Sequence, residues 1–159
     1  MKKHHSFTLL KPNPKGTGAA LKLALYPAHN GFEGFVRAEF AAQESAMEPR
    51  SFDWDNSMCL KLGFDDICRL LQVFRGECEQ INEGKGVVHK SKHGIHFLNL
   101  SHHIEPVCGY RLDYRRAENL SNERSISVFI APHEALGICY ALEHALGLLV
   151  FGIPEVIAD

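Results

Sequence analysis

The sequence predicts an α+β protein in which two four-stranded antiparallel β-sheets are each followed by an α-helix. Two segments carry this prediction. Over positions 58–62 apolar residues alternate with Cys59 and Lys61, and over 64–74 they recur at helical spacing. The same order returns at 126–130, and Pro132 then opens a second run with helical spacing. Because several short strand patterns precede each segment, we expect four strands and one helix, repeated twice.

The composition fits one soluble globular domain over residues 1–159, with pseudo-repeat halves at about 5–81 and 85–152. The chain has 45% hydrophobic and 23% charged residues, and its formal net charge is −2. A protein dedicated to binding nucleic acid is usually basic overall. Such a function would therefore require positive charge that is clustered locally.

Cysteine usage and the first residues of the sequence predict a cytoplasmic location. The five cysteines are odd in number and form no CxxC pair, which favours reduced thiols. The stretch MKKHHSFTLL has too few consecutive apolar residues for a signal-peptide core. We find no apolar stretch that approaches a membrane span, so we expect no membrane contact.

The first half begins with three predicted strands, over His5–Leu10, Ala19–Tyr26 and Gly34–Phe40. Prolines and glycines at positions 11–18 favour an exposed loop between the first two strands, and a turn precedes the third. The polar segment 42–50 contains Pro49 and predicts a longer loop before the fourth strand.

The first helix follows the fourth strand directly. Asp65 and Asp66 fall in its first turn, where exposed N–H groups and the positive end of the helix dipole favour carboxylates. Ile67, Leu70 and Leu71 recur at helical spacing. They give the helix an apolar face that can pack on a sheet.

The second half repeats this plan. Gly86–Lys92 and Gly94–Ser101 predict a hairpin, and Val107–Arg115 predicts a third strand. The polar segment Ala117–Asn122 predicts a loop before the last strand. The apolar stripe of the last helix consists of Ala135, Ile138, Cys139, Leu142, Leu146 and Leu149. This helix has more bulky aliphatic residues than one sheet requires, which predicts assembly of several chains.

The ten histidines do not form a recognisable metal site. His89, His93 and His96 lie on or beside a predicted turn, and the adjacent His102 and His103 would face opposite sides of a strand. The chain also has no GxSxG, HExxH or P-loop pattern. We therefore predict no metal, no cofactor and no enzymatic activity. A small-molecule-binding or hydrolytic domain that uses the histidines remains an alternative.

Basic residues are clustered around the predicted hairpins and are interleaved with aromatic residues. The basic residues are Lys11, Lys15, Lys22, Lys85, Lys90, Lys92, Arg111, Arg115 and Arg116, and the aromatic ones are Tyr26, Phe35, Phe97, Tyr110 and Tyr114. A sheet face that mixes cations with exposed rings suits a single strand of nucleic acid, because cations bind phosphates and rings stack on bases. Alternatively, the rings lie in the core and the lysines protect strand edges from aggregation. The alternation leaves both interpretations open.

Five stretches of the sequence resemble the Whirly family of single-stranded DNA-binding proteins. KGTGAAL at positions 15–21 resembles the KGKAAL strand motif of that family, although Thr17 and Gly18 stand where the family has one lysine. The other four are GFVRAEFA from position 34, FDWDNSMCLKLGFDDICRLL from 52, HFLNLS from 96 and the closing segment 127–153. Their order and spacing are similar to the family over nearly the whole chain.

The resemblance implies a fold, an assembly and a ligand. It implies the Whirly-like fold, which is also described as PC4-like, with two sheets packed across each other. It further implies a homotetramer formed through the helices, with single-stranded DNA along the sheet edges. The related mitochondrial guide-RNA-binding proteins share this fold, so RNA is an alternative ligand. Lys15 would meet phosphate, and Gly16, Ala19 and Ala20 would allow close approach of a strand.

We therefore predict a sequence-tolerant single-stranded nucleic-acid-binding protein, with a role in DNA maintenance or transcription regulation. The predicted binding residues are Lys15, Gly16, Ala19, Ala20, Lys22, Tyr26, Phe35, Arg37, Lys61, Lys90, Lys92 and Phe97. The lysines and the arginine would hold phosphates, and the rings would stack on bases. The main alternative is an oligomeric scaffold protein that has this fold and does not bind nucleic acid.

Overall fold

A computed structural model describes residues 5–119 and 121–154 and places the elements in the expected order. The first sheet, sheet 1, has β1 (Ser6–Lys11), β2 (Ala19–Tyr26), β3 (Phe35–Ala42) and β4 (Met58–Leu62) in sequential order, and α1 (Phe64–Phe74) follows it. The second sheet, sheet 2, has β5 (Val87–Ser91), β6 (Gly94–His103), β7 (Gly109–Asn119) and β8 (Asn122–Ile130), and α2 (Pro132–Phe151) follows it. A short 3₁₀ helix, η1 (Ile81–Gly84), joins the halves. All neighbouring strands are antiparallel.

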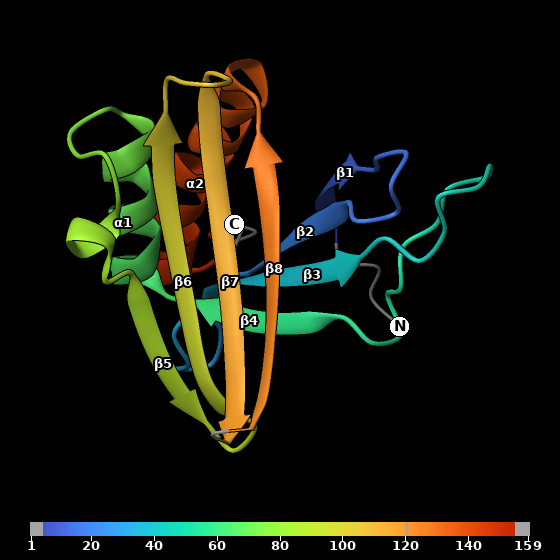
Figure 1. The fold of residues 1–159 in the computed structure, drawn as a ribbon. Helices are drawn as coiled ribbons and strands as arrows, with labels where there is room; N and C mark the ends of the chain where they lie inside the picture. Colours follow the sequence, from blue (N-terminus) through green and yellow to red (C-terminus); the bar gives the residue numbers. More distant parts are fainter. Residues whose placement is uncertain (1–4, 120, 155–159) are drawn as a thin grey trace.

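The strands of sheet 1 run across those of sheet 2 (Figure 1). The apolar side chains of alternate positions meet between the sheets and the helices in one continuous core. Tyr114 of β7 marks the crossing, because its ring stacks on Phe40 of β3 with 4.7 Å between ring centres. Its hydroxyl donates to the backbone oxygen of Cys59 at 3.2 Å. The α+β prediction of two sheets, each followed by a helix, is confirmed.

Each helix begins with an acidic residue that caps it. In α1, the Asp66 carboxylate accepts a hydrogen bond from the backbone N–H of Gly63 at 2.9 Å. In α2, Glu134 accepts one from the backbone N–H of Ala131 at 2.8 Å. Both carboxylates therefore satisfy a backbone donor that the helix itself leaves without a partner.

The first strand and the last helix of the described chain are joined. The Lys11 ammonium group at the end of β1 lies 2.6 Å from the Glu134 carboxylate at the start of α2. At the other end of α2, the backbone oxygens of Leu148 and Leu149 accept hydrogen bonds from Ala28 and Gly34, which flank the turn between β2 and β3. Sheet 1 is thus held at two points by the helix that follows sheet 2.

The hairpin of β7 and β8 is longer than the sequence predicts. Positions 117–122 read as a polar loop, but Ala117 pairs with Glu123 and Arg116 pairs with Arg124. The pairing continues as far as Asn119 with Asn122. The polar residues at these positions predicted a loop, but they belong to strand ends that project beyond the core. There the backbone pairing continues although the side chains are not buried.

Helix α2 has bulky apolar residues on its exposed side as well as on its buried stripe. It buries Ala135, Ile138, Leu142, Ala145 and Leu149, yet Leu136 and Tyr140 are 60% and 59% exposed. Among residues 5–119 and 121–154, it is the one helix long and apolar enough to cross a membrane, judged by length and composition alone. The expectation that no stretch reaches this length is therefore wrong. Core helices of soluble proteins meet the same criterion, and α2 packs against α1 and β7.

Candidate nucleic-acid interface

The outer face of sheet 1, which points away from the core, gathers most of the predicted binding residues of the first half. Alternation places Leu21, Leu23 and Leu25 of β2 toward the core, so Lys22 and Tyr26 point outward. The residues of this face on the three strands β2 to β4 are Ala20, Lys22, Ala24, Tyr26, Phe35, Arg37, Glu39, Ala41, Cys59 and Lys61. Arg37 lies directly opposite Lys61 in the pairing of β3 with β4.

Two lysines on this face lie over aromatic rings. The Lys61 ammonium nitrogen lies 4.6 Å from the centre of the Phe35 ring, and that of Lys22 lies 4.0 Å from the Trp54 ring. Phe35 in turn stacks on Tyr26 at 4.7 Å, with the two rings within 10° of parallel. The face therefore holds cations and flat apolar surfaces in direct contact.

One carboxylate, Glu39, lies among these cations. It is 3.7 Å from the ammonium group of Lys22 and 3.8 Å from the guanidinium group of Arg37, and it accepts a hydrogen bond from Ser57 at 2.7 Å. Arg37 also donates to the Cys59 sulfur at 3.1 Å, and this contact is the main cause that raises the pKa of the guanidinium group above its ordinary value. The face thus keeps a positive balance, because one acid is shared by two cations.

The loop between β1 and β2 presents Lys15 at one end of sheet 1. Gln43 holds this loop, because its side-chain oxygen accepts hydrogen bonds from the backbone of Asn13 and Gly18 at 2.8 and 3.0 Å. A Cβ atom on Gly18 would lie 2.2 Å from the Lys11 backbone oxygen, so only glycine fits there. Lys15 is exposed on this loop, and Gly16 beside it is half-buried.

Ala19 and Ala20 do not offer the accessible surface that the resemblance implies. Their exposed fractions are 5% and 0%. Both residues lie where β2 leaves the Gln43-bound loop, and β3 pairs with them through Ala42 and Ala41. Their small side chains therefore serve packing in the chain as described, and a strand on this face would contact their larger neighbours.

The predicted residues of sheet 2 are more dispersed. Lys90 on β5 is exposed, and so is Lys92 in the turn that follows. Phe97 on β6 is half-buried, and the Arg115 guanidinium carbon lies 4.7 Å from the centre of its ring. Lys90 lines a pocket together with Arg37 and Lys61, whereas Lys92 and Phe97 do not line it.

Lys90 reaches those cations through a pocket of about 350 Å³, here called the corner pocket, where the β4 edge of sheet 1 meets the β5–β6 hairpin. Its lining residues are Arg37, Cys59, Leu60, Lys61, His89, Lys90, Ser91, His93 and His96. The spacing of these histidines along the sequence does not predict a metal site, and it does not predict that they would meet Arg37 and Lys61 either. The strand pairing contains a signal for their placement, because His89 lies opposite His96.

The histidines of the corner pocket do not make it a metal site. No group of three or more metal-ligating side chains is assembled anywhere in residues 5–119 and 121–154. His89 instead contacts the Asp66 carboxylate at 3.0 Å, and His96 is bonded to Ser91 and Tyr114 at 2.8 and 2.7 Å. Burial and the nearby charge of Arg116 lower the pKa of His96 below 6.5.

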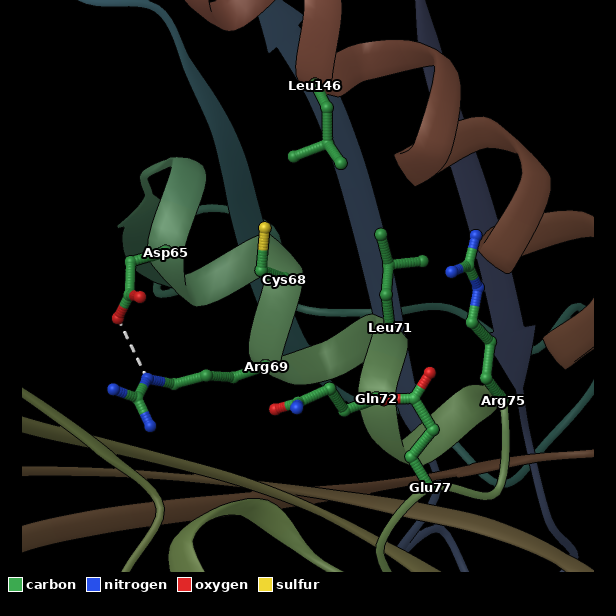
Figure 2. Close-up of a pocket in the computed structure, with 8 residues that line it drawn as sticks. All are labelled: Asp65, Cys68, Arg69, Leu71, Gln72, Arg75, Glu77 and Leu146. Atoms are coloured by element: carbon green, nitrogen blue, oxygen red, sulfur yellow. Dashed lines mark hydrogen bonds and ion pairs between the residues drawn. The ribbon is translucent and has the colours of Figure 1, made fainter.

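A larger pocket of about 430 Å³ lies between α1 and α2, and both of its arginines are already paired with carboxylates. Figure 2 shows one of these pairs, Arg69 with Asp65. The Arg69 side chain reaches Asp65 at 2.8 Å, and Arg75 reaches Glu143 at 2.6 Å. Carboxylates of Asp65 and Glu77 also line it. This pocket is therefore a poorer place for an anion than the corner pocket.

Comparison with known proteins finds likeness in structure rather than in sequence. No protein-family model matches the chain, and no curated protein matches it. The structure is similar to WHY1 from Arabidopsis thaliana, with a TM-score of 0.73, 16% identity, and coverage of 95% of this chain and 88% of that one. It is similar to the plant transcriptional regulator PBF-2, with a TM-score of 0.66, 17% identity, and coverage of 94% and 84%.

A second group of similar structures comes from guide-RNA-binding proteins. A guide-RNA-binding protein complex bound to a guide RNA gives a TM-score of 0.64 at 15% identity, with coverage of 91% of this chain and 91% of that one. At these identities the likeness concerns the fold. The chain has the fold shared by the Whirly proteins and the trypanosome guide-RNA-binding proteins MRP1 and MRP2.

Proposed function

We propose that the protein binds single-stranded nucleic acid, with DNA as the preferred ligand, along the outer face of sheet 1. The observation that carries this proposal is the set of cation–ring contacts on that face, in which Lys61 and Lys22 lie over Phe35 and Trp54. Single strands require both kinds of group, because phosphates bind cations and unpaired bases stack on rings. The fold shared with guide-RNA-binding proteins supports the same conclusion.

Binding exchanges one set of contacts for another. In the free protein, the Lys61 ammonium group covers the exposed side of Phe35, while Tyr26 stacks on the ring. When a base stacks on Phe35, Lys61 moves from the ring to a neighbouring phosphate. The lysine thereby keeps a favourable electrostatic partner in both states, and no base-specific hydrogen bond is required. This exchange accounts for sequence-tolerant binding.

The protein acts without catalysis and as an oligomer in this proposal. Helix α2 exposes Leu136, Tyr140 and Val150, each at least half exposed, on the side away from its own core. Burying such a surface against other copies would remove it from water. A homotetramer formed through the helices would also hold several sheet faces on one strand, which raises the effective concentration of each contact. Analytical ultracentrifugation tests this, and a monomer at micromolar concentration would contradict it.

Fluorescence anisotropy tests the binding function itself. Protein is titrated into three labelled probes, each at about 50 and 200 mM salt. The probes are oligo-dT, a single-stranded RNA of the same length and a DNA duplex. We expect oligo-dT to bind most tightly and to lose affinity with salt, because phosphate binding releases counterions. Absence of binding to every oligonucleotide at micromolar protein would overturn the function. Tighter binding of RNA would reassign the ligand within the same site.

A pair of matched variants tests the location of the site. Lys22→Glu combined with Lys61→Glu should lower the affinity for oligo-dT about 100-fold, because two charge-assisted contacts become repulsive. Arg69→Glu combined with Arg111→Glu makes the same change in net charge. These two arginines are already bound to Asp65 and Asp113, so we expect a loss within about threefold. An equal loss in both variants would show that overall charge, and not this face, governs binding.

A further inference from the structure

The corner pocket contains more positive charge than an internal phosphate of a single strand requires. Arg37 and Lys61 of sheet 1 and Lys90 of sheet 2 line it and carry this charge, and three histidines line it beside them. None of its lining residues is acidic. In a chain with a net charge of −2, this is a concentrated positive site.

The nearest carboxylates neutralise only part of this charge. Glu39 lies 3.8 Å from the Arg37 guanidinium group and is shared with Lys22. Asp66 lies 3.0 Å from His89. No ion pair between the described residues involves Lys61, Lys90 or His93. These three side chains are therefore available to an anion that enters the pocket.

One wall of the pocket is fixed by a chain of hydrogen bonds. The Tyr114 hydroxyl donates to the Cys59 backbone oxygen, so its oxygen accepts from Nδ1–H of His96 at 2.7 Å. Nε2 of His96 then accepts from the Ser91 hydroxyl at 2.8 Å, while the same hydroxyl oxygen accepts from the backbone N–H of His93 at 3.1 Å. This series of hydrogen bonds connects β5, β6 and β7 to β4. It fixes this wall of the pocket before an anion binds.

We propose that the corner pocket binds the terminal phosphate monoester of a nucleic-acid strand. This inference rests on the proposed function, because the rest of the strand would lie on the outer face of sheet 1, which Arg37 and Lys61 share with the pocket. An internal phosphodiester has one negative charge and two unbridged oxygens. A terminal monoester has a charge of about −1.5 to −2 near pH 7 and three such oxygens. Lys61, Lys90 and His93 line the pocket, and each can donate a hydrogen bond to one of these oxygens.

The terminal phosphate can be at the 5′ or the 3′ end of the strand, and the experiment distinguishes these two ends. Wild-type protein is titrated with an oligo-dT of about 16 residues that carries the dye at one end. Its other end is a 5′-phosphate, a 3′-phosphate or, as the control for each dye position, a hydroxyl. A hydroxyl-ended oligo-dT that is one residue longer has the same number of phosphates and controls for phosphate number. We expect one terminal phosphate to raise the affinity about tenfold above both hydroxyl-ended strands.

Two variants test whether the pocket causes this preference. Lys90→Ala combined with His93→Gln should reduce the affinity ratio between phosphorylated and hydroxyl-ended strands to about twofold or less. Lys92→Ala is the control, because Lys92 is exposed on the same hairpin and does not line the pocket. In this control the ratio should persist, whatever happens to the affinities themselves.

The outcomes separate this inference from the proposed function. Equal binding of all strands would overturn the terminal site and leave single-strand binding standing. Binding of phosphorylated strands alone would support the pocket and overturn the outer face as the main site. A ratio that survives Lys90→Ala with His93→Gln would place the phosphate elsewhere and overturn the inference. Absence of all binding would overturn both.

Discussion

The outer faces of the two sheets contain similar numbers of cations but arrange them differently. On sheet 2, Arg111 lies 2.8 Å from Asp113, and Arg115 lies 3.8 Å from Glu123, so each arginine has its own carboxylate. On sheet 1, Lys22 and Arg37 share Glu39, and no ion pair of the described residues involves Lys61. Rings lie under cations on both faces, Phe35 under Lys61 and Phe97 under Arg115, so the faces differ in their carboxylates. A count of basic residues would treat the two faces alike. The carboxylate partners of these cations differ, and the cations of sheet 1 are the ones left available to bind phosphates.

Removing a ring from each face gives the largest expected difference between them. Phe35→Ala should lower the affinity for oligo-dT about tenfold, because stacking on one ring contributes roughly 1–3 kcal/mol per base. The matched change on sheet 2 is Phe129→Ala, at a ring that is 37% exposed. We expect it to leave affinity unchanged. Anisotropy titrations measure both, with thermal melts to confirm folding, and equal losses would contradict a site on sheet 1.

Neutralising one acid on each face gives a smaller effect of opposite sign. Glu39→Gln retains an acceptor for the Ser57 hydroxyl and removes the negative charge beside Lys22 and Arg37. We expect affinity for oligo-dT to rise about threefold, since the two cations no longer share their charge with a carboxylate. Asp113→Asn makes the same change beside Arg111 on sheet 2 and should have no effect. Lower affinity in Glu39→Gln would show that the carboxylate positions the cations.

The smallest effect is expected for His96, which lies where the two sheets meet, and it concerns how the stability of the fold depends on pH. Burial first, and then the charges of Arg116, His89 and His93, lower the pKa of His96 in the folded protein. The unfolded chain therefore takes up this proton first as pH falls below about 6.5. Stability should be complete above that pH and should decline by a few degrees of melting temperature at lower pH. His96→Gln should remove this part of the decline, whereas exposed His133→Gln should retain it. Thermal melts across this range decide the matter.

Most of the fold was predictable because its signals are local. Alternation over short segments, the acidic first turn of α1 and Pro132 at the start of α2 are all signals between neighbouring residues, and they predicted the strands and helices in their order. The outward direction of Tyr26 and Phe35 was not predictable from alternation alone, because an aromatic strand residue fits either face. The three leucines of β2 decide it by occupying the core side.

The corner pocket could not be predicted from the sequence, since it depends on how the sheets cross. Arg37 and Lys61 meet the residues of positions 89–96 only because β4 is an edge strand and the β5–β6 hairpin lies beside it. The burial of Ala19 and Ala20 has a similar origin. Residues more than twenty positions later meet them there: β3 pairs with both alanines, and Gln43 holds the loop that precedes them.

The ties between sheet 1 and α2 have a consequence for how the chain folds during synthesis. Sheet 1 is made first, yet its hairpin ends are fastened by Glu134, Leu148 and Leu149, which the ribosome adds more than a hundred residues later. The apolar, core-facing side of sheet 1 therefore stays exposed to solvent until α2 has been synthesised. A nascent chain stalled before α2 would be a natural client for a chaperone.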